Sequence, residues 1–440
     1  MQVFAALRHR NFRLFWFGQV ISVSGTWMQS VGQAWLVLTL THNAFLLGLV
    51  GVFQFLPVLC LSLVGGMLAD KLPKRNVLMG TQSAAAVQAL VMFILTATGV
   101  VRVWHVFVLA ACLGTINALD IPTRQAFISE MVPQRDLMNA ISLNSAQFNA
   151  SRVVGPGVAG VLIAALGIPP LFCFNALSYI AVIGGLALMN PALLQRTRKL
   201  ATGERPLRQI REGVAFAVRT PMIRLSLIML FAISTFGLNF NITLPLLADT
   251  VYHSGATGFG TMSSLLGLGS LLAALALAAL VKKPHAALLV LGAAVFGSYE
   301  AVLAFVPHQQ QALAILAVIG FASISFSATA NTMLQTHSPA HMRGRVMSLF
   351  AMVFAGATPI GALATGAIAG AWGTSAALLA GAAPCLAVAA LGLAVLIRGR
   401  QTTTAAQVRP AVQGAPALEL GTALPSSAGE IVPLRAHQAN

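Results

Sequence analysis

Long apolar runs leave few folds open to this chain of 440 residues. A helix needs roughly 20 apolar residues to cross the hydrocarbon core of a bilayer. Runs of about this length cover residues 14–38, 44–69, 77–99, 103–122, 140–166, 168–189, 222–248, 257–281, 286–306, 312–334, 346–370 and 374–397. They are rich in Gly, Ala and Leu, and they lack the sustained alternation of apolar and polar residues that strands of a membrane barrel show. The sequence therefore predicts an all-α integral membrane protein with about twelve transmembrane helices.

The net charge of +16 is concentrated at the ends of these runs. Clusters of Lys and Arg lie before the first run and after every second run, whereas the alternate loops carry little beyond Arg102. By the positive-inside rule, the basic loops and both termini lie in the cytoplasm. A lipid surface accounts for this placement of charge, so we expect no nucleic-acid partner. We expect a multi-pass protein of the bacterial inner (plasma) membrane.

Two segments of the chain resemble each other and indicate a duplication. Residues Ser129 to Gly160 and Thr336 to Gly366 share loop, polar and glycine positions, and the residue numbers within each pair differ by 206. The pairs include Pro133 with Pro339, Phe148 with Phe354, Gly160 with Gly366 and Gly167 with Gly373. Both copies lead from a basic loop into an apolar run, so the halves share one orientation and form parallel repeats. The alternative is chance similarity between helices rich in Gly and Ala.

The repeat and the charge pattern together predict four parts. Residues 1–190 and 221–400 form an N-terminal and a C-terminal six-helix bundle, which are the two parallel six-helix repeats. Residues 191–220 form a cytoplasmic linker with an amphipathic helix on the cytoplasmic leaflet, because Leu207, Ile210, Val214 and Val218 share one face. Residues 401–440 are rich in Ala, Thr, Pro and Ser and are expected to be a disordered cytoplasmic tail.

The end of the second run carries the motif GGMLADKLPKR. Five positions fit G-x-x-x-D-[RK]-x-x-[RK]-R: Gly66, Asp70, Lys71, Lys74 and Arg75. This pattern resembles the loop signature of the major facilitator superfamily, although Pro73 stands where the family usually has glycine. The resemblance implies the major facilitator fold and a conformational latch on the cytoplasmic side, with Gly66 allowing a close helix approach. The alternative is that the cations only set the topology.

The fifth run contains a second motif, RVVGPGVAG, with Gly155, Pro156, Gly157 and Gly160. It is similar to a fifth-helix motif of antiporters in the same superfamily. A proline between glycines bends a helix and lets it slide against a neighbour, and a purely structural kink is the alternative. With the segments Asn117 to Pro133 and Asn139 to Pro156, residues 12–400 resemble the twelve-span bacterial exporter branch that includes the enterobactin exporter and macrolide efflux proteins. The resemblance implies proton-driven export of siderophores or hydrophobic, drug-like compounds.

Polar residues at helical spacing predict the walls of a transport cavity. The first run has Gln19, Ser22, Thr26, Gln29 and Gln33 on one face. Further polar faces are Ser142, Ser145, Asn149 and Arg152 in the fifth run, Ser234, Gly237 and Asn241 in the seventh, and Ser323, Ser327 and Asn331 in the tenth. The alternative is hydrogen bonding between helices, which fits the serines better than the long glutamines.

Charged residues inside apolar runs are an independent sign of a transport path, since a charge in hydrocarbon needs water or a partner. We expect Arg152 to contact an anionic group of the substrate or a carboxylate of the cavity. Asp120 and Glu300 are candidates for proton exchange. The alternatives are a static salt bridge for Arg152 and an interfacial position for Glu300.

Nothing in the sequence indicates an enzyme. There is no Walker loop, and the histidines and cysteines lack the spacing of metal ligands. We expect no cofactor and no metal, a proton gradient as the energy source, and a monomer that acts on a small-molecule substrate by alternating access. An importer or uniporter on the same scaffold remains open, as does a transport-inactive membrane scaffold or assembly factor.

Overall fold

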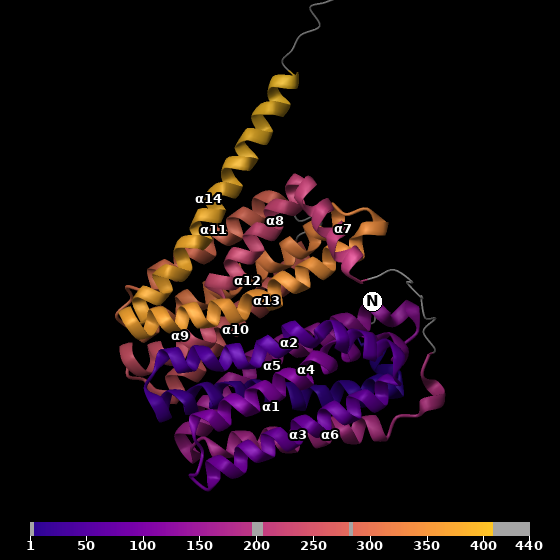
Figure 1. Cartoon of the computed structure of the whole chain (residues 1–440), viewed down its shortest axis with the longest axis vertical. Helices are drawn as coiled ribbons and strands as arrows, with labels where there is room; N and C mark the ends of the chain where they lie inside the picture. Colours follow the sequence, from indigo (N-terminus) through magenta and orange to yellow (C-terminus); the bar gives the residue numbers. More distant parts are fainter. Residues whose placement is uncertain (1–3, 196–205, 281–284, 408–440) are drawn as a thin grey trace, which may run out of the picture. The chain divides into compact units, whose positions relative to one another are not determined.

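The protein is almost entirely helical in the computed structural model, which describes residues 4–195, 206–280 and 285–407 (Figure 1). No strand occurs among these residues. The first half contains α1 (Arg10–Thr41), α2 (Ala44–Lys71), α3 (Lys74–Ala97), α4 (Val103–Met131), α5 (Leu137–Leu166) and α6 (Pro169–Ala187). After α7 (Pro206–Arg219) follow α8 (Pro221–Ala232), α9 (Phe240–Leu246), α10 (Gly255–Leu280), α11 (Ala286–Leu303), α12 (Gln309–Thr336), α13 (Ala340–Trp372) and α14 (Thr374–Gln407). The predicted all-α class is confirmed.

Ten ranges of the described residues are long and apolar enough to cross a bilayer. One of them, Met342–Arg398, runs over both α13 and α14, and α1 is not among the ten. The polar stripe of α1 and its basic first turn lower the mean hydropathy of that helix, although its length is ample. The multi-pass membrane character is therefore clear, while the number of twelve spans stays a prediction.

The ends of α5 and α13 reproduce the internal repeat. Gly167 and Gly373 cap these two helices at φ +80° and +85°, in the left-handed region that favours glycine. Their backbone N–H groups donate to Ile163 O at 2.9 Å and to Ala369 O at 3.0 Å. Two glycines related by the same 206 positions thus do the same structural work.

Each half packs through its own neighbours, and two helix pairs join the halves. In the first half α1 packs against α5 and α6, α2 against α4, and α3 against α4 and α6. In the second half α12 packs against α10 and α11. The contacts between the halves are formed mainly by α2 with α13 and by α5 with α10. The space enclosed by these two pairs is the place to look for a transport cavity.

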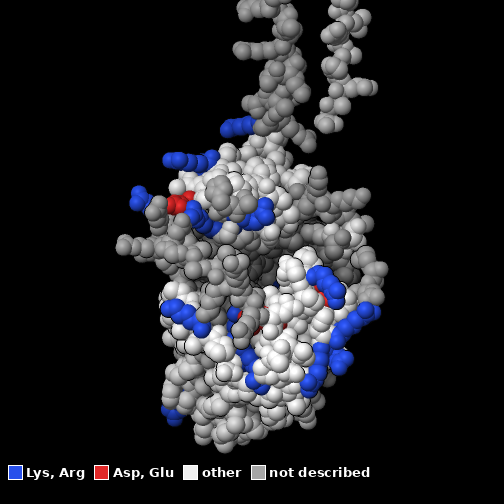
Figure 2. Space-filling model, turned by 90° about the vertical axis from the view of Figure 1, so that its right-hand side faces the viewer, with Lys and Arg blue, Asp and Glu red and all other residues white. Residues whose placement is uncertain are grey.

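The two ends of the bundle differ in charge. The basic end is the one that carries the connections at residues 72–73, 132–136 and 337–339, together with α7. The opposite end carries the connections at residues 42–43, 98–102, 167–168 and 373. Figure 2 shows the face at the basic end, where Lys and Arg side chains surround a central hollow.

The seventh apolar run is not one continuous helix. A π-helix, η4 (Ile233–Gly237), follows α8, and a second, η5 (Leu247–Val251), follows α9. Between them, the side-chain Nδ2 of Asn239 donates to Thr235 O at 2.7 Å and to Phe236 O at 3.2 Å. An amide that binds backbone carbonyls competes with the helical ladder, and π-helical turns are frequent at functional sites.

The linker and the tail are described in part. The predicted linker helix is α7, and its Glu212 forms an ion pair with Arg345 of α13. Its place on a membrane leaflet stays a prediction. The helix α14 continues to Gln407, beyond the end of the last apolar run at residue 397. Residues 408–440 lie outside the described residues, and the compact unit that contains the helical bundle ends at Leu396.

Candidate transport cavity

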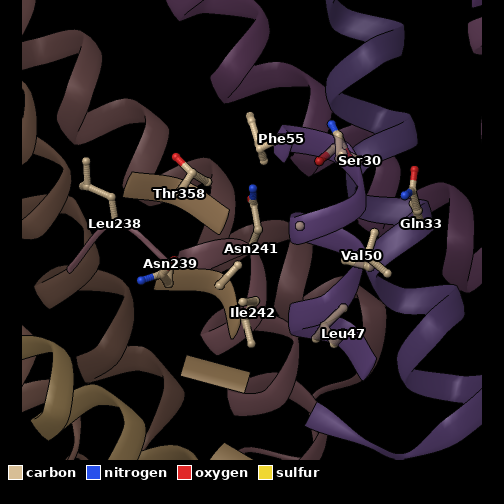
Figure 3. Close-up of a pocket in the computed structure, with 14 residues that line it drawn as sticks. Ser30, Gln33, Leu47, Val50, Phe55, Leu238, Asn239, Asn241, Ile242 and Thr358 are labelled. Atoms are coloured by element: carbon tan, nitrogen blue, oxygen red, sulfur yellow. The ribbon is translucent and has the colours of Figure 1, made fainter. Parts of the chain in front are cut away.

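A cavity lies between the two halves and holds about 570 Å³ of empty space, part of it open to solvent. Its walls come from four helical segments, α1 and α2 of the first half and α9 and α13 of the second, together with the residues just before α9. Figure 3 shows side chains of the two halves on opposite sides of this space. Its polar lining residues are Ser30, Gln33, Gln54, Asn239, Asn241 and Thr358, and its apolar ones include Leu47, Val50, Phe55, Leu238 and Ile242. An apolar wall with a few polar groups is typical of a ligand-binding site.

At the opposite end, helices of the two halves cross at two glycines, Gly160 and Gly366, and we call these contacts the glycine crossings. A Cβ added to Gly160 of α5 would lie 2.8 Å from Ala256 O and 3.0 Å from the Cα of Gly260 in α10. A Cβ added to Gly366 of α13 would lie 2.8 Å from Ala44 O and 3.1 Å from the Cα of Gly48 in α2. Both contacts are with backbone atoms, which cannot move aside as a flexible side chain could. The halves are therefore in direct backbone contact at this end.

Other glycines of the fifth-helix motif also face neighbouring helices. A Cβ at Gly155 would lie 2.6 Å from Trp27 Cβ of α1, and one at Gly157 would lie 2.7 Å from Ser264 Oγ of α10. The helix α5 continues through Pro156 without a break. The motif thus allows two close helix contacts on different sides of α5, and its role in sliding stays a prediction.

The polar face of α1 points mostly into the first half. Gln29 Nε2 donates to Gln88 Oε1 at 3.1 Å, and Asn175 Nδ2 donates to Gln29 Oε1 at 2.7 Å. Gln19 Oε1 accepts from Arg124 Nη1 at 3.1 Å. Ser22 is buried, and Thr26 Oγ1 lies 3.5 Å from the Tyr179 hydroxyl. These contacts match the alternative of hydrogen bonding between helices, and a transport role for these residues stays a prediction.

Gln33 is the member of that face that lines the cavity, and its Nε2 is buried without a hydrogen-bond partner among the described residues. A free amide donor in a cavity wall is suited to bind a ligand oxygen. The three α12 residues that were expected in the cavity wall do not line this cavity. Ser323 Oγ donates to Gly320 O at 2.9 Å, Asn331 Oδ1 accepts from Gln335 Nε2 at 2.5 Å, and Ser327 is partly buried.

Four polar lining residues were not singled out from the sequence: Ser30, Gln54, Asn239 and Thr358. Gln54 could have been predicted from the sequence, because it is a polar amide inside the apolar run at residues 44–69. Thr358 could have been predicted as well, since it lies 206 positions after Arg152 and is its repeat partner. Asn241, which was expected on a polar face of the seventh run, does line the cavity.

Arg152 lies on the side of α5 that faces the space between the halves. The neighbouring Gly155 contacts α1, and Val153 O accepts a hydrogen bond from Ser264 Oγ of α10 at 2.8 Å. The Arg152 Cζ lies 5.9 Å from the centre of the Trp27 ring. One turn earlier, Asn149 Nδ2 donates to Ser145 O at 2.8 Å. Neither Arg152 nor Asn149 lines the cavity of Figure 3 directly.

Both carboxylate oxygens of Asp120 have partners inside the first half. Its carboxylate accepts from Thr81 Oγ1 and Gln82 Nε2, both at 2.8 Å, and forms an ion pair with Arg124. The side chain is 1% exposed. Every part of this network lies within one half, so the arrangement is that of a structural ion pair. Proton exchange at Asp120 stays a prediction.

This network yields a stability prediction. Replacing Asp120 by Ala leaves the partly buried Arg124 guanidinium without its carboxylate and removes the acceptor of two further hydrogen bonds, so we expect a loss of about 2–4 kcal/mol in the free energy of unfolding. Thermal unfolding of the purified protein in detergent measures it. The control is Asp136→Ala, which removes a more exposed ion pair with His9 and is expected to cost about 1 kcal/mol or less. Equal effects of the two substitutions would contradict the interpretation.

Glu300 of α11 is in a different environment. It is 2% exposed, and its Oε2 has no hydrogen-bond partner among the described residues. A Cβ added to Gly381 of α14 would lie 2.8 Å from Glu300 Oε1 and 2.7 Å from Phe236 O. The carboxyl group and the carbonyl of π-helix η4 therefore converge on one glycine. The same carbonyl accepts from Asn239, a cavity residue, so Glu300 and a cavity residue lie near the same turn of η4.

The residues of the predicted latch hold the first half together at the basic end. Lys74 Nζ lies 2.5 Å from Glu130 Oε1, and Arg75 Nε donates to Leu186 O at 2.7 Å. Lys71 is exposed, and the side chain of Asp70 lies outside the described residues. The close approach expected at Gly66 occurs at Gly65, where a Cβ would lie 3.2 Å from the Cα of Leu119 in α4. A latch between the halves stays a prediction.

Comparisons with known proteins agree with this architecture. The profile of a family described as "Transmembrane secretion effector", a division of the major facilitator superfamily, matches residues 1–432. The chain is 27% identical to the staphyloferrin A transporter of Staphylococcus aureus over 80% of its own length and 87% of the relative. It is 27% identical to the multidrug efflux pump Tap of Mycolicibacterium fortuitum, over 85% and 92%. It is 24% identical to the enterobactin exporter EntS of Shigella boydii, over 78% and 81%.

Solved structures show the same fold at low sequence identity. A mutant form of the nucleoside transporter NupG superposes with a TM-score of 0.72 at 14% identity, covering 87% of this chain and 98% of that one. A POT family transporter superposes with a TM-score of 0.70 at 12% identity, covering 90% and 97%. The expected major facilitator fold class is confirmed.

Proposed function

Because the chain belongs to the transmembrane secretion effector family of the major facilitator superfamily, we propose that it exports a siderophore or a hydrophobic, drug-like compound across the bacterial inner membrane. The family and the relatives are membrane transporters, not enzymes. The named relatives that carry staphyloferrin A, drugs and enterobactin support this substrate range. The single observation that carries the proposal is a cavity lined by polar and apolar residues of both halves.

The mechanism we propose is alternating access around this cavity. The basic end faces the cytoplasm by the positive-inside rule, which places both termini there. The hollow at the basic end and the glycine crossings at the opposite end then correspond to an inward-facing state. Opening the crossings and closing the basic end would release the substrate outside, as expected for two repeats that rock against each other. The protein acts as a monomer with no cofactor.

The energy source we propose is the proton gradient, with Glu300 as the proton carrier. A buried carboxylate without a partner is costly, so a proton on Glu300 favours the packed state. Asp120 is less suited, because Thr81, Gln82 and Arg124 satisfy its charged form. Loss of the Glu300 proton would favour an arrangement that lets water reach the carboxylate.

Transport into everted membrane vesicles tests the proposal. Vesicles acidified inside should accumulate ethidium or labelled enterobactin when they contain the protein, and dissipation of the pH gradient by nigericin should abolish the accumulation. With one proton exchanged per substrate, a gradient of one pH unit can drive accumulation up to about tenfold, and we expect uptake to approach this limit only in vesicles that contain the protein. Uptake in the reverse direction would indicate an importer. Absence of any gradient-dependent flux across a panel of siderophores and dyes would favour a membrane scaffold.

A further inference from the structure

The guanidinium of Arg152 has no counter-charge among the described residues. It is partly buried near the middle of α5, roughly 22 Å along the helix axis from Leu137. It makes no hydrogen bond or ion pair with the described residues, and its Cζ lies 5.9 Å from the centre of the Trp27 ring. An unpaired cation at this depth costs about 2.5 kcal/mol or more unless water or an anion meets it.

The chain has few groups that could supply this anion. It contains ten acidic residues, and those with described ion pairs are Asp120, Glu130, Asp136 and Glu212. Glu300 is buried inside the second half, and Asp249 lies in η5 near the opposite end. The remaining four are Asp70 in the last turn of α2 and Glu204, Glu419 and Glu430 outside the described residues. None of these four belongs to the middle of an apolar run, where Arg152 lies.

Aromatic rings lie beside the guanidinium instead. Trp27 contacts Phe148 edge to face, with ring centres 5.9 Å apart. Phe148 lies one turn before Arg152 on α5 and is 48% exposed. Trp27 lies one turn before the cavity residue Ser30 on α1. A cation beside two rings, next to the cavity, matches a planar anion that can stack and accept paired hydrogen bonds.

The two walls of the space differ in charge. The repeat partner of Arg152 is Thr358, a cavity residue, so the second half offers a neutral hydroxyl where the first half offers a cation. Val154, Val158 and Val161 are exposed on the other side of α5, which marks the lipid-facing side and leaves Arg152 toward the interior. The guanidinium is therefore directed to the space between the halves and not to lipid.

We propose that Arg152, Trp27 and Phe148 form a subsite for an organic anion, namely an aromatic carboxylate or phenolate. This inference rests on the proposed export function and names the chemical class of its substrate. The carboxylate or phenolate binds the guanidinium, and the ring of the compound packs against Trp27 and Phe148. The substrate itself brings the negative charge that the cavity lacks.

Binding measurements without a gradient test this subsite separately from transport. The protein in lipid nanodiscs is dialysed against radiolabelled salicylate or its neutral analogue salicylamide, which keeps the ring and loses the charge. We expect the wild type to bind salicylate more tightly than salicylamide, and Arg152→Gln to weaken salicylate binding by about tenfold or more. Salicylamide binding should change less than twofold. Arg135→Gln is the matched control, because it removes an exposed Arg at the basic end and should leave both affinities unchanged.

Two further variants separate charge from packing. Arg152→Lys keeps the charge and should retain part of the salicylate preference, while Trp27→Leu should weaken both ligands equally. Equal affinity of the wild type for the two ligands, or no binding of either, would overturn the proposal, and so would unchanged salicylate binding in Arg152→Gln. Charge-selective binding combined with no transport in vesicles would instead remove the export function and leave the subsite in place.

Discussion

Gly366→Ala is expected to reduce export at least tenfold and to shift the protein away from the inward-facing state. The added Cβ would lie 2.8 Å from Ala44 O, closer than real Cβ atoms approach, and a tight 3.1 Å from the Cα of Gly48. The helices α13 and α2 must therefore separate at the opposite end. Gly160→Ala, the repeat-related substitution, should act in the same direction through Ala256 O at 2.8 Å.

Cysteine accessibility measures this shift. In a variant without the native cysteines, Ser30→Cys places a thiol in the cavity wall. An impermeant maleimide added outside intact cells should label this thiol faster when Gly366 is Ala than when it is Gly. The matched control is Gly184→Ala on α6, where a Cβ meets nothing within 4 Å. Alanine stabilises a helix by up to about 1 kcal/mol relative to glycine. A loss of export in Gly366→Ala that is absent in Gly184→Ala therefore cannot come from helix propensity.

Glu300→Gln is expected to abolish uphill transport while leaving exchange of substrate across the membrane intact. The amide has nearly the same shape as the carboxyl group but no proton to exchange, so accumulation against a gradient should fall to the level set by passive equilibration. Proteoliposomes containing a pH-sensitive dye report the proton flux, and counterflow of labelled substrate reports exchange. Counterflow must persist for the result to support a role in coupling, because its loss would indicate a folding or binding defect.

Two controls define the surroundings of Glu300. Among the described residues, the titratable neighbour on the packed elements is Cys385 of α14, while η4 contributes no charged side chain. Cys385→Ala should therefore leave coupling unchanged. Asp249→Asn, which removes a partly buried carboxylate near the end of the bundle, should do the same. Gradient-driven accumulation at the wild-type rate by Glu300→Gln would exclude this residue as the proton carrier.

Much of the fold followed from apolar length, loop charge and the 206-residue repeat. Gly167 and Gly373 are an example. A positive φ at the end of a helix depends on the residue at that one position, so a glycine in the sequence is enough to predict it. The break in the seventh run was missed, since residues 222–248 are apolar on average and the effect of Asn239 depends on which carbonyls its amide reaches.

The cavity was harder to predict for a related reason. A period of 3.6 residues shows that Gln19, Gln29 and Gln33 share a face, but it does not show which helix that face meets. In the structure Gln29 meets Gln88 and Asn175, and Gln33 alone of the three reaches the cavity. Burial and partners likewise separate Asp120 from Glu300, which look alike in the sequence.

The crossings at Gly160 and Gly366 have a further energetic consequence. Where backbone rests on backbone, parting the helices uncovers little hydrocarbon and disturbs no interlocked rotamers. The free energy of separation there is small, because the transfer cost of about 25 cal/mol per Å² applies to little apolar area. A seal of this kind is tight when shut yet easily released.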